Sequence, residues 1–436
     1  MDILRRILRK RWTLLAVALV AGVIGAWPAF ESGLTPPEPH RDLDVTALER
    51  GLEKYQDFGD TFSWFTGYWI GLNPFWRPLS SYAFWTLHKV LGWENHDRYE
   101  LVRAVCHVIV TGMLFWFVMV VTGRPLLALL AVAMQNLLIP LPVIEKLYTP
   151  VGVTPVARWI SLPDIWLAMV TLPALSLAWR GKLWWSVPLV AAAAMLKETG
   201  FVVFPLVMLF YWWRHRRLHP AFVALIAIAV VFAALKLTCV GPGWILGSNR
   251  SIWTRMARFA LPRPINYMLT GSIPWTLMGI GAGIAVIVGC GPRRRPRLAL
   301  AIITGSLIAS LVAYRYAVGI PGGSPDWDIA LAGLFERRLY STTTPQIAVW
   351  VIAAWAGLRG PDRRLVVLLV IAHLVMGLPA TIAPQTGTRS LYTAMLFSSV
   401  ISAICAWSLP LVFGRPVREQ PAVDRSDTEE PLVENA

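Results

Sequence analysis

Residues 102–123 read VRAVCHVIVTGMLFWFVMVVTG, and after Arg124 a second apolar run, PLLALLAVAMQNLLIPLPVI, occupies residues 125–144. An apolar stretch of about 20 residues is long enough to cross a lipid bilayer as an α-helix. The two runs therefore predict two membrane-spanning helices that are joined at a basic residue.

The same pattern recurs along the whole chain of 436 residues. Hydrophobic residues make up 56% of the sequence and charged residues 15%, against about 25% charged residues in an average globular protein. Mean hydropathy is +0.56. This composition excludes a soluble enzyme, a disordered protein and a disulfide scaffold. It predicts an all-α polytopic membrane protein with about twelve spans, at 12–30, 102–123, 125–144, 161–179, 183–196, 200–213, 220–241, 273–291, 298–319, 346–358, 365–383 and 391–413.

The net charge of +15 is concentrated in short basic pieces between these spans. They are residues 5–11, Arg124, 180–182, 214–217, 293–297 and 359–364. Because cytoplasmic loops of membrane proteins are enriched in Lys and Arg, this pattern predicts a multi-pass protein, expected in a bacterial plasma membrane, with both termini in the cytoplasm. The positive-inside rule accounts for this charge, so membrane lipids are expected as partners and nucleic acid is not. We expect one transmembrane domain over 1–413 and a disordered polar tail over 414–436.

The longest polar stretch is the first extracytoplasmic loop, residues 31–101, which holds eleven of the 25 acidic residues and many aromatic ones. Within it, residues 79–91 (LSSYAFWTLHKVL) have the spacing of an amphipathic helix that lies in the membrane interface. An aromatic belt with solvated acids is one interpretation of the loop. A site that holds a sugar between carboxylates and aromatic rings is the other.

Four stretches resemble, in the same order, motifs of GT-C-type membrane glycosyltransferases. The first is FWRPLSS at 75–81, similar to a YRPL segment of the first external loop, and the second is SLPDIWLA at 161–168, similar to a GRxDLLA span opening. The third is AMLKETG at 194–200 followed by Pro205-Leu206, similar to LSKETAxxLPL, and the fourth is TRSLY at 388–392, similar to RYLYLP. His107 fits the second histidine of a His-x-x-Asn-x-x-x-His pattern, whereas Glu100 and Arg103 replace its first histidine and its asparagine.

The resemblance implies a GT-C fold and an inverting transfer of a sugar from a polyprenyl-phosphate carrier to a glycan, lipid or protein acceptor outside the cytoplasm. It is closest to bacterial polyprenyl-phosphate-sugar transferases and to the membrane half of O-mannosyltransferases with tetratricopeptide repeats. No cofactor is required by the residues, and a divalent cation assists some members. The donor phosphate is expected at Arg389, Lys197 and Arg77, with supporting roles for Glu198, His107, Tyr392 and Asp164.

A carboxylate of the first loop is expected to act as the general base that accepts the proton of the acceptor hydroxyl. Asp42 and Asp44 form one candidate pair, and in an extended segment both would face the same side. Asp57 and Asp60 form a second pair, which a turn at Gly59 would direct toward solvent. We choose Asp44 as base with Asp42 in support and keep Asp57 and Asp60 as alternatives. The remaining interpretation is that all four are solvated acids.

Other interpretations remain open beside these assignments. Lys197 and Glu198 either face an internal cavity or form a surface turn with a snorkelling lysine. Asp164 also suits a helix N-terminus, and His107 also suits a packing histidine. A transporter or flippase of a lipid-linked sugar is the alternative function, although no repeat relates the two halves of the chain. An inactive family member with a binding role is the third, because of the departures at Glu100 and Arg103.

Overall fold

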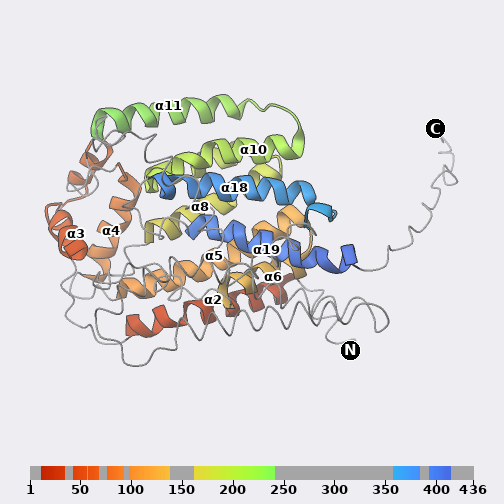
Figure 1. The fold of residues 1–436 in the computed structure, drawn as a ribbon. Coiled ribbons are helices and arrows are strands. Elements are labelled where there is room, and N and C mark those ends of the chain that lie inside the picture. The colour runs from red at the N-terminus through yellow and green to blue at the C-terminus, as the bar shows by residue number, and fades with distance from the viewer. Residues whose placement is uncertain are drawn as a thin grey trace, which may run out of the picture.

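The computed structural model describes residues 11–34, 43–55, 57–67, 76–92, 98–137, 162–240, 357–382 and 392–413. Within these ranges every regular element is a helix, and the helices of the bundle run side by side (Figure 1). The bundle consists of α2 (Arg11–Leu34), α5 (Arg98–Thr122), α6 (Pro125–Leu137), α8 (Leu162–Trp179), α9 (Leu183–Leu196), α10 (Val203–His215), α11 (Ala221–Val240), α18 (Arg363–Ile382) and α19 (Tyr392–Phe413). The predicted all-α class is therefore confirmed for the described residues.

Nine of the expected spans coincide with these helices, with ends that differ by a few residues, although residues 138–144 of the expected span 125–144 lie outside the described residues. Within the described ranges, three helices are long and apolar enough to cross a membrane, namely Arg98–Thr122, Leu162–Trp179 and Ala221–Cys239. Shorter apolar helices lie at Trp12–Trp27, Pro125–Asn136, Leu183–Leu196 and Tyr392–Cys405. The expected spans 273–291 and 298–319, most of 346–358, and the expected tail 414–436 lie outside the described residues. The count of twelve spans stays a prediction.

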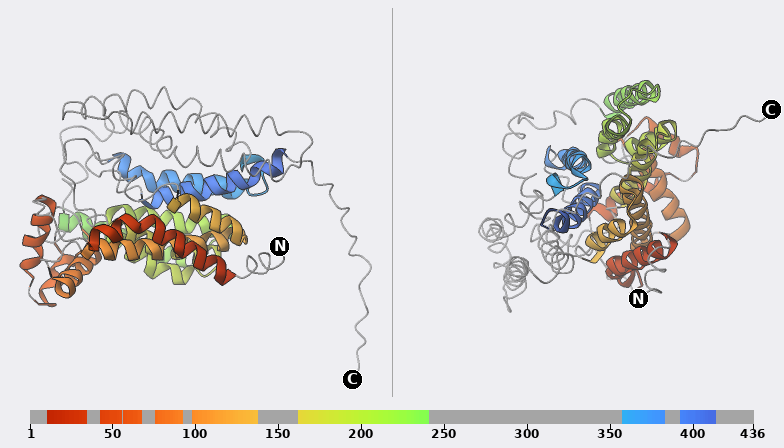
Figure 2. Two further views of the ribbon diagram at one scale, coloured as in Figure 1. Left: turned by 90° about the horizontal axis from the view of Figure 1, so that it is seen from below. Right: turned by 90° about the vertical axis from the view of Figure 1, so that its right-hand side faces the viewer.

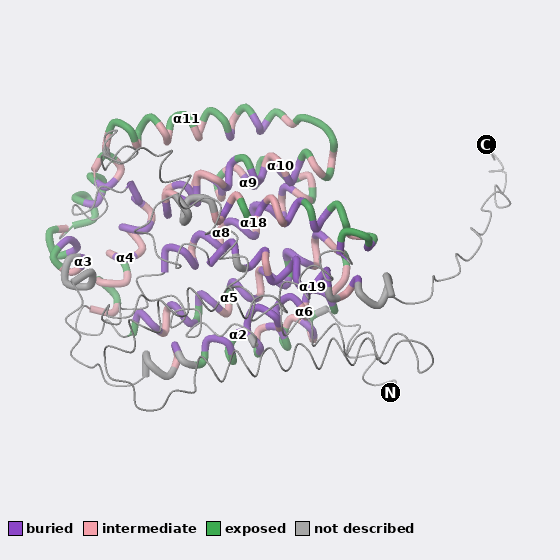
Figure 3. Tube along the Cα trace, viewed as in Figure 1, coloured by how far each residue is buried: buried purple, intermediate pink, exposed green. Residues whose placement is uncertain are grey.

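Helix α5 packs against α2, α6 and α8. Its sequence is apolar on every side, which is typical of a helix that is surrounded by others or by lipid. Phe117 of α5 is fully buried and contacts the rings of Phe210 on α10 and Phe397 on α19, with ring centroids 6.1 and 6.2 Å apart. By contrast, α11 lies at the edge of the bundle in Figure 2 and is mostly exposed in Figure 3. The core therefore runs along α5, and α11 forms an outer wall.

Small residues let α2 approach its neighbours closely. A Cβ atom at Gly25 would stand 2.9 Å from Asn136 of α6, and one at Gly22 would stand 3.1 Å from Thr111 of α5. Small side chains at helix contacts are what allows backbones to come together inside a membrane, where no water drives helices to associate. The first span is therefore packed into the bundle.

The basic pieces that the structure describes all lie at one end of the bundle, here called the basic end. Arg124, between α5 and α6, forms an ion pair of 2.5 Å with Asp362, which precedes α18. His215, at the end of α10, donates from Nε2 to the carbonyl of Trp179, at the end of α8, at 3.2 Å. The segments around residues 124 and 362 therefore meet, as do those around residues 180 and 215, which agrees with loops that share one side.

The opposite end, here called the loop end, is covered by three short elements of the first loop (Figure 1). They are α3 (Leu43–Glu53), the 3₁₀ helix η1 (Asp60–Phe65) and α4 (Pro78–Leu91). Helix α4 contains the predicted amphipathic segment 79–91, and it buries Phe84 and Ser81 while Lys89 and Val90 are exposed. The prediction of an amphipathic helix is confirmed, and this helix packs against α9.

The two ends should lie on opposite sides of a membrane if the bundle spans it. Gly59 and Leu218 are exposed, Gly59 at the loop end and Leu218 at the basic end. In a background whose four native cysteines are replaced by serine, we expect a membrane-impermeant maleimide to label Gly59→Cys in intact cells. Leu218→Cys should react only after permeabilisation. Labelling of both positions from the same side would contradict this orientation.

Candidate functional site

Four charged side chains from three of the resembling stretches meet at the loop end, and we call them the charge cluster: Arg77, Asp164, Lys197 and Glu198. The guanidinium of Arg77 holds Glu198 by two groups, with Nε 2.8 Å from Oε1 and Nη2 2.6 Å from Oε2. Lys197 Nζ donates to Asp164 Oδ1. Arg77 and Glu198 are 121 positions apart in the sequence, so the fold brings the stretches 75–81, 161–168 and 194–200 into one site.

Local sequence explains why these residues are positioned so firmly. Pro78 occupies the first turn of α4, where proline needs no hydrogen-bonded N–H, and Arg77 immediately precedes it. The hydroxyl of Ser80 donates at 2.5 Å to the carbonyl of Leu196, the last residue of α9. Carbonyls at a helix C-terminus lack partners within the helix, so Ser80 satisfies one of them. Helix α4 is therefore fastened to the end of α9 beside the ion pairs.

Gly200 permits the tight connection between α9 and α10. After Lys197 the chain forms the 3₁₀ helix η3 (Glu198–Val202) and enters α10 at Val203. A Cβ atom at position 200 would stand 1.9 Å from the carbonyl oxygen of Ala193, which no side-chain rotation can relieve. The glycine therefore lets η3 fold back against α9, and this fold places Lys197 and Glu198 inside the protein.

The charge cluster is largely shielded from water, since Arg77 is 8%, Lys197 5% and Asp164 4% exposed. Burial raises the pKa of Glu198, but the charge and hydrogen bonds of Arg77 outweigh it and hold that pKa below the ordinary value. Burial lowers the pKa of Lys197, and Asp164 opposes this effect. Removing one partner of such a buried pair leaves an uncompensated charge, which is strongly destabilising.

The lysine side chain does not extend to the surface, because Lys197 is buried and donates to Asp164. The interpretation of this segment as a surface turn with a snorkelling lysine is therefore wrong.

Lys236 of α11 is a neighbour of the cluster that the sequence analysis missed. Its ammonium lies 5.3 Å from the ring centroid of Phe201 in η3, and its charge acts on Glu198. Among the described residues the site then contains three cations, Arg77, Lys197 and Lys236, and two carboxylates. The available signal was a lone lysine within the apolar run 221–240. Such an intramembrane charge usually has a functional partner.

Two hydroxyl groups next to the cluster lack a partner. The Oγ1 atom of Thr199 and the Oγ atom of Ser81 are buried and form no hydrogen bond with any part of the chain that the structure describes. Thr199 follows Glu198 in the sequence, and Ser81 follows the Ser80 that binds α9. Buried hydroxyls without partners are uncommon in proteins, so both are candidates to contact a bound molecule.

His107 and Tyr392 lie in a separate polar network in the bundle core. The Tyr392 hydroxyl is 2.7 Å from His107 Nδ1, and His107 Nε2 is 2.6 Å from Asn136 Oδ1. A neutral imidazole with its proton on Nε2 satisfies both bonds. The network links α5, α6 and α19, and Asn136 also accepts from Thr111 at 3.3 Å. His107 is thus a hydrogen-bonded packing histidine, the simpler of its two interpretations, and sequence reasoning did not identify Asn136.

Glu100 and Arg103 replace two residues of the resembled histidine pattern, and they compensate each other. Arg103 is fully buried, Glu100 is 6% exposed, and Arg103 Nε donates to Glu100 Oε2 at 2.7 Å. The pair lies one helical turn apart on α5, a spacing at which opposite charges meet. The two charges are therefore paired with each other within α5.

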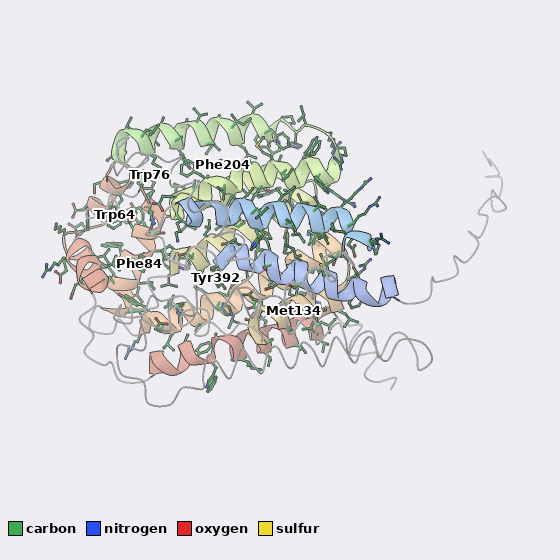
Figure 4. The ribbon with its side chains drawn as sticks, viewed as in Figure 1. Trp64, Trp76, Phe84, Met134, Phe204 and Tyr392 are labelled. Carbon is green, nitrogen blue, oxygen red and sulfur yellow. The ribbon has the colours of Figure 1, made fainter. Side chains whose placement is uncertain are left out.

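The first loop forms an aromatic layer on the bundle end. Trp64 packs against Tyr55 and Tyr82, with ring centroids 4.7 and 5.3 Å apart, and Trp85 donates from Nε1 to the carbonyl of Tyr55 at 3.0 Å. Figure 4 shows Trp64, Trp76 and Phe84 at this end. Phe58 remains 58% exposed. Aromatic rings of the loop therefore both build the layer and face outward.

The candidate bases occupy different positions. Asp57 and Asp60 are both exposed, Asp57 just before η1 and Asp60 as its first residue. The Asp60 carboxylate accepts a hydrogen bond from the backbone N–H of Asp57 at 3.3 Å. The expectation that a turn directs them toward solvent is confirmed. Asp44 belongs to the first turn of α3, so the extended conformation considered for it is wrong, and strand alternation cannot align it with Asp42. Asp42 and Arg389 lie outside the described residues, and their roles stay predictions.

Metal binding has no candidate cluster within the ranges that the structure describes, because no three His, Cys, Asp or Glu side chains gather there. The divalent cation that assists some GT-C enzymes is therefore not assigned to any residues.

Gly200→Ala should disrupt the site because the added methyl group collides with backbone atoms of Ala193. We expect a loss of about 1–3 kcal/mol in unfolding free energy, measured by tryptophan fluorescence during thermal or denaturant unfolding in detergent. Gly59→Ala is the matched control, since a Cβ atom there meets nothing within 4 Å and its φ is −59°. Equal stability of the two variants would refute the close contact.

Tyr392→Phe should weaken the core network because it removes the hydroxyl bound to His107. A single hydrogen bond of this kind contributes about 0.5–1.5 kcal/mol. Asn136→Leu should cost more, since it leaves the buried imidazole N–H of His107 without its acceptor. Ser408→Ala is the control, because that hydroxyl binds only a carbonyl of its own helix. If the three variants Tyr392→Phe, Asn136→Leu and Ser408→Ala unfolded at the same temperature, that result would argue against an interhelical network.

Comparison of the chain with protein-family models, with curated proteins and with solved structures found no match. The site's geometry, the charge pattern and the resemblance of short motifs are accordingly what bears on its function.

Proposed function

We propose that this protein is a membrane glycosyltransferase of the GT-C type that moves a sugar from a polyprenyl-phosphate carrier to an acceptor outside the cytoplasm. The protein crosses a bacterial plasma membrane about twelve times, with both termini in the cytoplasm. Its reaction takes place at the loop end. The chemistry inverts the anomeric carbon, because a base activates the acceptor hydroxyl while the phosphate leaves from the opposite face of the sugar.

The observation that carries this proposal is the convergence of three of the four resembling stretches on one buried cluster. Their charged residues make the contacts: Arg77 binds Glu198, and Lys197 binds Asp164. Unrelated short matches would have no reason to meet, since they come from separate parts of the chain. The meeting point also lies opposite the basic end, which is where a transferase that uses external acceptors needs its site.

The charges of the cluster suit a lipid phosphate. A phosphate leaving group carries negative charge, so fixed cations stabilise its departure. Arg77 and Lys197 each have a carboxylate partner, and Glu198 and Asp164 thereby act as positioning residues. Lys236 adds a third cation close to Glu198. Together with Arg389, these three cations form the donor-phosphate side of the proposed site.

The first loop supplies the acceptor side. Its aromatic layer and its acids adjoin α4, which is fastened to α9 beside the charge cluster. The base remains Asp44, with Asp42 in support and Asp57 or Asp60 as alternatives. The buried hydroxyls of Thr199 and Ser81 are available to bind sugar or phosphate oxygens. In this arrangement the base and the leaving phosphate are held by different elements, as displacement from opposite faces requires.

The proposal is tested in a strain that lacks the protein. Deletion should cause a polyprenyl-phosphate sugar to accumulate in lipid extracts, as measured by mass spectrometry, together with loss of a glycan modification. In spheroplasts the accumulated sugar should be oxidised by periodate, because it has already reached the outer leaflet. Accumulation that periodate cannot reach would favour a flippase, and no accumulation would reject both functions.

Complementation of that strain identifies the base. Asp44→Asn should fail to restore transfer at matched expression, because an amide cannot accept the proton of the acceptor hydroxyl. Asp57→Asn and Asp60→Asn are matched controls from the same loop and should restore near-normal transfer. General base catalysis contributes about 10²–10⁴-fold to rates, so the difference should be large. Normal turnover in Asp44→Asn, with loss in one of the other two, would transfer the role to that residue.

A further inference from the structure

Five exposed cations gather at the basic end on two neighbouring turns. Arg180 and Lys182 belong to the turn between α8 and α9. Arg214 lies in the last turn of α10, and Arg216 and Arg217 follow it in the turn that leads to α11. The turns adjoin each other, since the guanidinium carbon of Arg214 lies 5.6 Å from the ring centroid of Trp179, next to Arg180. We call these five residues the basic patch.

The arginines of the patch are held by aromatic side chains. The guanidinium carbon of Arg180 lies 5.5 Å from the ring centroid of Trp116. Arg217 Nε donates to the Tyr211 hydroxyl at 3.2 Å. Within the described part of the chain, no carboxylate forms an ion pair with any of the five cations. An aromatic ring orients a cation through its electron-rich face, and it leaves the net positive charge in place.

Other cations of the protein are treated differently. Arg124, at the same end, is paired with Asp362 at 2.5 Å, and Arg77 is paired with Glu198 at 2.6 Å. A carboxylate partner neutralises the charge that it positions. The basic patch therefore combines fixed geometry with uncompensated charge, which is the condition for binding an anion from outside the chain.

Arg216 is held in a backbone conformation that glycine normally occupies. It follows α10 with φ 55° and ψ 27°, in the left-handed region, and among the described non-glycine residues it alone has positive φ. Glycine is the usual residue at this position of a helix end. The arginine instead places its guanidinium carbon 4.8 Å from the ring centroid of Trp212 and 5.2 Å from that of Trp213. The left-handed backbone at Arg216 thus accompanies a fixed position of its guanidinium group between two tryptophan rings.

Apolar surface adjoins the patch on both turns. Trp184 is 56%, Trp185 71% and Trp212 40% exposed, and the first turns of α11 expose Val223 and Ile226. Trp184 also contacts His219 with ring centroids 6.2 Å apart, which connects the two turns. Exposed tryptophans beside cations are typical of the membrane interface, so a ligand of this patch has both an anionic and an apolar part.

We propose that the basic patch is a headgroup site for anionic phospholipids of the surrounding bilayer. The phosphate is held by the guanidinium groups of Arg214 and Arg216, whose planar donors match phosphate oxygens. The acyl chains lie along the exposed apolar side chains of α9 and α11. This site is independent of the proposed sugar transfer, since it lies at the other end of the bundle.

The test measures lipid binding by the purified full-length protein in a neutral detergent, using native mass spectrometry. Phosphatidylglycerol and phosphatidylcholine with identical acyl chains serve as probes. We expect clear preference for phosphatidylglycerol. Each cation near an anionic surface contributes about fivefold to binding, so Arg216→Gly and Arg180→Gln should each weaken phosphatidylglycerol binding by about that factor. Arg124→Gln, which removes a cation that has its own carboxylate, should leave the preference intact.

Arg216→Gly separates a binding role from a structural one. Because glycine adopts the left-handed conformation without strain, the variant should unfold at the same or a higher temperature while it loses lipid. Equal binding of both lipids by the unchanged protein would overturn the proposal, as would an intact preference in both Arg216→Gly and Arg180→Gln. Complete displacement of the lipid by millimolar glycerol 3-phosphate would also overturn it, because a soluble anion would then suffice.

Discussion

The bidentate ion pair between Arg77 and Glu198 is the contact on which the loop end depends. It joins the start of α4 to the junction of α9 and α10, and Ser80 strengthens the same connection by binding the carbonyl of Leu196. In a buried setting neither charge can be left alone without a large cost in free energy. The first loop is therefore held in one place against the bundle, and its aromatic layer and acids have a fixed position relative to the charge cluster.

The two ends of the bundle use charge in different ways. At the loop end, cations are positioned by carboxylates, so a ligand there meets geometry that is already fixed and a net charge of modest size. At the basic end, the arginines of the basic patch are positioned by tryptophan and tyrosine rings and keep their full charge. The first arrangement suits a site where bonds are made and broken. The second suits continuous contact with an anionic lipid surface.

Polar residues inside the bundle have mainly a structural role. His107 is fully used by its bonds to Tyr392 and Asn136, and Arg103 is matched by Glu100 on its own helix. A buried polar group without a partner would cost about 1–3 kcal/mol, so these bonds specify which helix faces meet. They explain how α19, from the far end of the chain, is placed against α5 and α6.

The sequence by itself determined the all-helical class, most helix ends within the described residues, and the gathering of the described basic pieces at one end. These properties follow from the length of apolar runs and from the positions of charges between them, which are local features. Only the tertiary structure decided the partners: Asp164 for Lys197, Asn136 for His107, and Lys236 as a neighbour of Glu198. It also decided that Asp44 lies in the first turn of a helix. The physical reason is that hydropathy determines which residues are removed from water. The packing of side chains determines which faces of helices distant in the sequence contact each other.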